Sequence, residues 1–109
     1  MNKDFIPLVK AAEEGSESAF EELYSMTREM SYFMALSITH DEQDALDIMQ
    51  ESYFKAFSNL KALKSPEKFD NWLCRIVSNT GKSHMMQKRP MLFESISDEA
   101  MYELSLIHI

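Results

Sequence analysis

The sequence predicts an all-α protein, a compact bundle of three to four helices. Hydrophobic residues make up 45% of its 109 residues, and only two Gly and three Pro interrupt them. Apolar side chains recur at steps of three and four residues through most of the chain, which is the spacing of a helix with one buried face. This length is typical of a single domain, so we expect the helices to share one core.

The first half of the chain contains two predicted helices. Residues 3–14 are expected to form a short helix that ends at Gly15, because glycine is the usual residue just past a helix end. Ser16 or Ser18 can cap a second helix that runs to about Thr39. Its apolar residues, at steps of three and four, are Phe20, Leu23, Tyr24, Met30, Phe33, Met34 and Ile38.

Residues 44–60 are expected to form a third helix with two chemically different faces, and Asp41 can supply its N-cap oxygen. The apolar arc, about 120° wide, should face the core. It consists of Ala45, Leu46, Met49, Tyr53, Ala56, Phe57 and Leu60. The other side carries Asp44, Asp47, Ile48, Glu51, Phe54 and Ser58. Exposed apolar side chains among acids are typical of a partner-binding surface.

A short basic loop, residues 61–64, precedes the fourth predicted helix. Ser65, Pro66 and Glu67 indicate its start, because a serine cap, a proline in the first turn and an acid near the positive end of the helix dipole all favour one. The pattern continues to about Lys88. The inner face of this helix consists of Phe69, Leu73, Ile76, Val77 and Thr80.

The outer face of the fourth helix carries cations and amides without an acid, over an arc of about 80°. It consists of Lys68, Asn71, Arg75, Asn79 and Lys82. Trp72 lies at the seam with the core face, where its ring can pack, stack on a base, or do both. Gly81, inside the helix, is expected to cost up to about 1 kcal/mol relative to alanine. A basic stripe alone leaves open an ordinary solvated face.

The net charge of −7 conceals one basic segment. Residues 61–89 hold seven basic and two acidic side chains. Residues 1–60 hold four basic and twelve acidic side chains, and residues 90–109 hold four acidic side chains and no basic one. Since salt screens a surface charge beyond about 8 to 10 Å, a docked polyanion would experience the local positive charge. The distribution therefore favours a nucleic-acid surface on residues 61–89 despite the acidic total.

The order of residues in the third helix resembles a known motif. Asp44-Ala45, Asp47, Gln50-Glu51 and Tyr53-Phe54 resemble the D-A-x-D-x-x-Q-E-x-F signature in region 2 of bacterial sigma factors, especially the extracytoplasmic-function (ECF) group. Residues 69–79 resemble the F-x-x-W-L-x-R-I-x-x-N pattern of region 2.4 in the same family. The resemblance covers roughly residues 6–90 and implies the helical bundle of sigma region 2.

The resemblance implies a sigma factor subunit that binds core RNA polymerase and that recognises and melts the promoter minus-ten element to initiate transcription. The clamp helices of the largest polymerase subunit would contact Asp44, Asp47, Ile48, Gln50, Glu51, Phe54 and Ser58. Promoter DNA, mainly the single-stranded non-template strand, would contact Lys61, Lys64, Lys68, Asn71, Trp72, Arg75, Asn79, Lys82, Lys88 and Arg89. The single cysteine favours a reducing cytosol, and the N-terminus has no apolar run followed by a small-residue cleavage site, so a cytoplasmic protein is expected. No cofactor is expected, and the family implies an anti-sigma factor as a further candidate partner.

The expected organisation is a sigma region 2 domain over residues 1–89 and an acidic linker over residues 90–103. In the family such a linker leads to a second helical domain, region 4, which reads the upstream minus-thirty-five element and is expected to be missing here. The last six residues, LSLIHI, match the translation of a transposon adapter used in sequencing libraries. We therefore expect residues 104–109 to be adapter read-through and exclude them from the fold.

Other classes of function fit the residues less well. Asp44, Asp47 and Glu51 could be imagined as metal ligands, but the Glu-x-x-His motif of a di-iron bundle is missing, so neither a metal site nor an enzyme is expected. Cys74 has no second cysteine for a disulfide. No segment reaches the roughly 18 apolar residues of a membrane span, so no membrane insertion is expected. The open alternative is a helical protein–protein interaction module or adaptor without a DNA-binding function.

Overall fold

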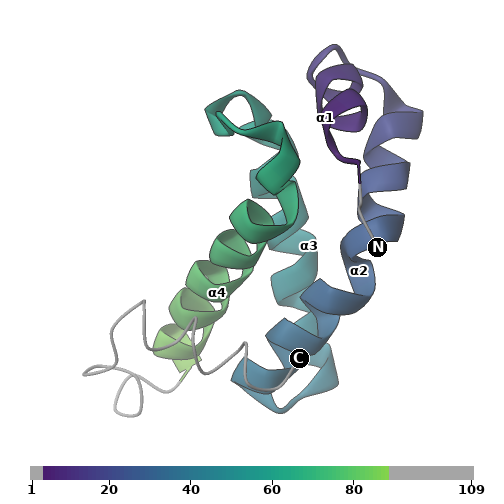
Figure 1. Cartoon of the computed structure of the whole chain (residues 1–109). Coiled ribbons are helices and arrows are strands. Elements are labelled where there is room, and N and C mark those ends of the chain that lie inside the picture. The colour runs from purple at the N-terminus through teal and green to yellow at the C-terminus, as the bar shows by residue number, and fades with distance from the viewer. Residues whose placement is uncertain (1–3, 89–109) are drawn as a thin grey trace.

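Four α-helices and two short 3-10 helices form residues 4–88, the part of the chain that the computed structural model describes (Figure 1). The elements in chain order are α1 (Ile6–Glu13), α2 (Glu17–Thr39), α3 (Glu42–Ser58), η1 (Leu60–Ala62), η2 (Pro66–Lys68) and α4 (Phe69–Lys88). The predicted all-α fold class is confirmed. The expected linker and the suspected adapter segment lie outside the described residues.

Helices α2, α3 and α4 each contact the other two, so the core lies along the line where the three meet (Figure 1). The short helix α1 packs against α2 and against both 3-10 helices, and it covers the end of the bundle at which α4 begins. Within the described residues, no helix is long and apolar enough to cross a membrane. The arrangement leaves one side of α3 and one side of α4 facing outward.

Local capping explains where α2 and α3 begin. The Ser16 side chain accepts a hydrogen bond from the Ala19 amide at 3.2 Å, and Gly15 precedes it with a φ of 96°. Asp41 accepts from the Asp44 amide at 3.0 Å, as predicted. Each cap satisfies one backbone N–H that a helix start would otherwise leave unpaired.

The start of the last helix differs from the prediction. The Ser65 side chain makes no capping bond, and residues 66–68 form a 3-10 turn in which the Lys68 amide donates to the Ser65 carbonyl at 2.8 Å. Helix α4 therefore begins at Phe69, three residues later than expected. The side chain of Phe69 is fully buried and lies 5.6 Å from the ring of Phe5, centroid to centroid.

The core combines apolar side chains with one buried hydroxyl cluster. The largest fully buried apolar side chains are Phe5, Phe69, Leu23, Met34, Ile48, Leu73, Val9 and Val77. The Tyr53 hydroxyl lies 2.7 Å from Thr27 Oγ1 and 2.9 Å from Ser31 Oγ, so α3 is hydrogen-bonded to α2 inside the core. Three side chains on the predicted apolar faces are instead exposed: Leu46 at 50%, Phe33 at 46% and Tyr24 at 41%. They lie at the margins of their helices' apolar arcs, where no other helix of the described residues covers them.

Candidate functional site

The exposed side of α3 carries an open hollow. It is lined by Asp47, Gln50, Glu51 and Phe54, which recur at helical spacing and so share one face. Phe54 is 73% exposed, the largest exposed fraction among the large hydrophobic side chains described as exposed. Two carboxylates and an amide therefore surround an apolar ring that does not pack into the core of the bundle. Ser58, one turn further on, is exposed beside them.

Ile48, predicted to lie among these acids, is fully buried. Its Cδ1 atom faces α4 and lies 3.6 Å from the position that a Cβ atom on Gly81 would occupy. Because α3 packs against α2 on one side and α4 on the other, its buried arc is wider than a single apolar stripe. The expectation that Ile48 offers an exposed apolar contact is wrong.

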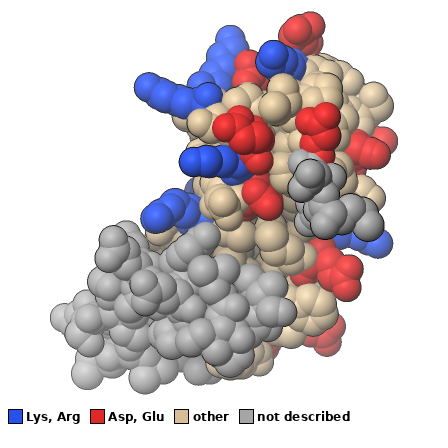
Figure 2. All heavy atoms as spheres, viewed as in Figure 1, with Lys and Arg blue, Asp and Glu red and all other residues tan. Residues whose placement is uncertain are grey.

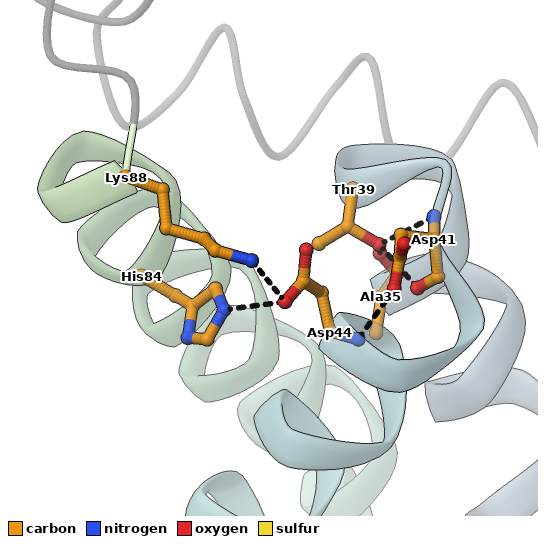
Figure 3. Close-up of polar contacts among 6 residues, drawn as sticks. All are labelled: Ala35, Thr39, Asp41, Asp44, His84 and Lys88. Atoms are coloured by element: carbon orange, nitrogen blue, oxygen red, sulfur yellow. Dashed lines mark hydrogen bonds and ion pairs between the residues drawn. The ribbon is translucent and has the colours of Figure 1, made fainter.

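Asp44 is also turned inward, against expectation (Figure 3). Its Oδ1 atom accepts from Lys88 Nζ at 2.8 Å and lies 3.1 Å from His84 Nε2. The hydrogen bond from Lys88, followed by that from His84, holds the pKa of Asp44 below its ordinary value, although partial desolvation opposes the shift. Asp44 therefore joins the first turn of α3 to the last turn of α4 and does not lie on the exposed face.

A second hollow, which the sequence pattern did not reveal, lies between α2 and α3. It is lined by Tyr24, Arg28, Glu29, Tyr32, Leu46 and Met49. Leu46 and Gln50 are one turn apart on α3, so this groove adjoins the hollow around Phe54. The signal that could have indicated it is the position of Leu46 at the edge of the predicted apolar arc, beside the polar face.

The predicted basic residues gather along one side of the molecule, over α4 and the segment before it (Figure 2). Of the residues predicted to contact DNA, those that are exposed are Lys61, Lys64, Lys68, Asn71, Arg75, Asn79 and Lys88. Lys82 and Trp72 are partly buried. Lys88 pairs with Asp44, yet 54% of its side chain is exposed. Arg89 lies outside the described residues.

Trp72 borders a third hollow, between the end of α3 and the outer side of α4. The hollow is lined by Lys55, Asn59, Trp72, Ile76, Asn79 and Thr80. It brings together an indole, two amides and an ammonium, which suit stacking on a base, hydrogen bonding to a base edge and pairing with a phosphate. The sequence pattern predicts Trp72 and Asn79 on this surface but does not indicate Lys55, which comes from a different helix.

Residues 4–88 contain no grouping of His, Cys, Asp and Glu side chains that could hold a metal ion. Cys74 is buried, and its thiol lies 3.7 Å from the sulfur of Met30. The three hollows are lined by polar, aromatic and charged side chains. The described residues thus form a helical bundle with an acidic and apolar side on α3 and a basic side along α4 and the segment before it.

Residues 23–90 match the Sigma-70 region 2 family, and because this is more than half of the sequence, the chain belongs to that family. It is 31% identical over 81 residues to the RNA polymerase sigma-H factor of Pseudomonas aeruginosa, a match that covers 74% of this chain and 42% of that protein. It is 26% identical over 82 residues to the ECF RNA polymerase sigma factor SigW of Bacillus subtilis, a match that covers 75% of this chain and 44% of that protein.

The ECF RNA polymerase sigma-E factor of Haemophilus influenzae is 28% identical over 96 residues, which cover 85% of this chain and 50% of that protein. The chain thus spans half or less of the length of these relatives. The resemblance to region 2 of ECF-type sigma factors is confirmed.

Proposed function

We propose that this chain is the part of an ECF-type sigma factor that binds core RNA polymerase and the promoter minus-ten element. The observation that carries the proposal is the placement of two chemically opposite surfaces on one small bundle. The acidic hollow around Phe54 lies on α3, and the basic residues line α4 and the segment before it. A sigma factor needs both, because it must bind a protein and a polyanion at the same time.

The polymerase surface would be centred on Phe54, with Asp47, Gln50 and Glu51 around it. A large apolar ring surrounded by acids matches a partner that offers an apolar pocket with basic residues at its rim. Leu46 and the groove between α2 and α3 would extend this surface, because they adjoin it on the same helix. Ser58 would lie at its other end. Ile48 and Asp44 are excluded from it by their burial.

The DNA surface would run from Lys61 and Lys64 through Lys68 to Arg75, with the Trp72 hollow beside it. Lysine and arginine would neutralise phosphates, and Asn79 would read a base edge. A base taken out of the stack loses a few kcal/mol. Stacking on an aromatic side chain returns about 1 to 3 kcal/mol per base, so the indole supports a role in holding unpaired DNA.

The test of the polymerase contact is capture of bacterial core RNA polymerase by the chain. We expect capture by the unaltered chain, loss in the double variant Asp47→Arg/Glu51→Arg, and retention in Lys68→Glu/Arg75→Glu. Each double variant reverses two exposed charges, so each serves as the control for the other. A folded chain that captures no polymerase would contradict this half of the proposal.

The test of the DNA contact is binding to a single-stranded minus-ten oligonucleotide at several salt concentrations. Affinity should fall steeply as salt rises, because phosphate contacts release counterions. Lys68→Glu/Arg75→Glu should abolish binding, whereas Asp47→Arg/Glu51→Arg should not weaken it. Polymerase capture without oligonucleotide binding at any salt would instead identify the chain as an adaptor that uses only the α3 surface.

A further inference from the structure

Lys55 connects the two surfaces. Its ammonium nitrogen lies 3.0 Å from Glu51 Oε2, one turn earlier on α3, and donates a hydrogen bond to Thr80 Oγ1 on α4 at 3.2 Å. Glu51 lines the acidic hollow, and Thr80 lines the hollow beside Trp72. One cation is therefore shared between the side of the bundle assigned to polymerase and the side assigned to DNA.

The position of Lys55 also suits contact with a nucleotide. Its side chain is 45% exposed and lines the same hollow as Trp72 and Asn79. A base stacked on the indole would bring the adjoining phosphate within reach of a flexible lysine at the rim. The surrounding amides and hydroxyl are neutral, so Glu51 is the acid that the structure pairs with this ammonium.

We propose that Lys55 binds a phosphate of the single-stranded DNA and that Glu51 sets how strongly it does so. While Glu51 is unengaged, its carboxylate offsets the lysine charge. When a protein partner engages Glu51, the ammonium is released toward the DNA, so binding at α3 strengthens binding at α4 and the reverse holds by linkage. This inference rests on the proposed function and adds a coupling between its two surfaces.

The first arm of the test measures the phosphate contact by fluorescence anisotropy, with the full chain and a labelled single-stranded minus-ten oligonucleotide. Lys55→Met keeps most of the aliphatic stem but removes the charge. It should weaken binding about threefold to tenfold at 0.1 M salt and reduce the salt slope by about 0.7, the value for one phosphate on a single strand. Lys55→Arg should retain most of the affinity. Arg28→Ala, which removes a charge from the groove on the other side of α3, is the matched control and should change little.

The second arm measures the coupling. Glu51→Gln should tighten oligonucleotide binding about twofold, the scale of an exposed ion pair between residues one turn apart. The same substitution should have no effect in the Lys55→Met background. Asp47→Asn removes an acid from the same face of α3 without touching this ion pair and should leave affinity nearly unchanged.

The outcomes separate this inference from the proposed function. Binding that is lost in Lys68→Glu/Arg75→Glu but unchanged in Lys55→Met would support the DNA surface and overturn the role of Lys55. Equal effects of Glu51→Gln and Asp47→Asn would overturn the coupling, and this comparison decides even if Lys55→Met fails to fold. Absence of oligonucleotide binding by the unaltered folded chain would overturn the DNA half of the proposed function and this inference with it.

Discussion

The carboxylate of Asp44 lies 2.8 Å from the ammonium of Lys88, and this ion pair joins the first turn of α3 to the last turn of α4 (Figure 3). His84 contacts the same carboxylate oxygen at 3.1 Å. The pair holds the end of α4 against the rest of the bundle, and α4 carries basic residues of the proposed DNA surface. Asp44 thus has a structural role within a motif whose other acids face outward.

The pH dependence of stability should report this pair. The pKa of Asp44 is lowered in the folded chain, first by Lys88 and then by His84. A carboxyl group with a depressed folded pKa stabilises the fold above its unfolded pKa of about 3.9, and that stabilisation is lost as the pH falls through the folded pKa. Asp44→Asn should therefore lower the urea midpoint at pH 7, with a difference from the unaltered chain that shrinks below about pH 4.

The matched control for this measurement is Asp47→Asn, since Asp47 is exposed on the same helix. Asp47→Asn should leave the urea midpoint nearly unchanged both at pH 7 and below about pH 4. A difference between Asp44→Asn and the unaltered chain that persists undiminished at pH 2.5 would show that packing rather than the ion pair is responsible.

The buried hydroxyl of Tyr53 should contribute measurably to stability. It contacts Thr27 Oγ1 and Ser31 Oγ, which also donate to the backbone carbonyls of Leu23 and Arg28. Removing the tyrosine oxygen therefore leaves both hydroxyls with a backbone partner, so the cost should be that of ordinary hydrogen bonds. Tyr53→Phe should lower the free energy of unfolding by about 1 to 2 kcal/mol in urea titrations. Tyr24→Phe, at a ring that is 41% exposed, should cost clearly less.

Replacing Gly81 with alanine should not give the increase in stability that is usual for a glycine inside a helix. A Cβ atom there would lie 3.0 Å from Ile38 Cδ1 and 3.4 Å from Ile38 Cγ2, so the gain of about 1 kcal/mol in helix propensity is offset by crowding. Gly81→Ala should be close to neutral by itself. In an Ile38→Val background, which removes the nearest methyl group, it should stabilise by about 0.5 to 1 kcal/mol. Equal effects in both backgrounds would rule out the crowding.

The helices and most of their ends were predictable because their causes are local. Asp41 caps α3 through an amide three residues away, and Gly15 follows α1 with a positive φ. The buried faces were less predictable, because they depend on how many neighbours a helix has. The apolar arc of α3 predicts that Leu46 is buried and Ile48 exposed. Because α3 packs against both α2 and α4, Ile48 is buried and Leu46 is exposed. Lys55 was missed for the same reason, since its relation to Thr80 exists only once α3 and α4 are packed.

The two apolar residues that the motif groups together, Ile48 and Phe54, should therefore behave oppositely. Ile48 is fully buried and Phe54 is 73% exposed. Ile48→Ala should lower the free energy of unfolding by about 2 to 5 kcal/mol, because it leaves a cavity between α3 and α4. Phe54→Ala should change stability by less than about 0.5 kcal/mol, as surface substitutions usually do, yet reduce capture of core polymerase.

Urea unfolding and polymerase capture, both measured on Ile48→Ala and Phe54→Ala, test this prediction. Capture by Ile48→Val is measured alongside, to separate loss of folded protein from loss of contact. This variant should lower the free energy of unfolding by only about 0.5 to 1.5 kcal/mol, and its capture of core polymerase should match that of the unaltered chain. Full capture by Phe54→Ala would remove this ring from the proposed polymerase contact.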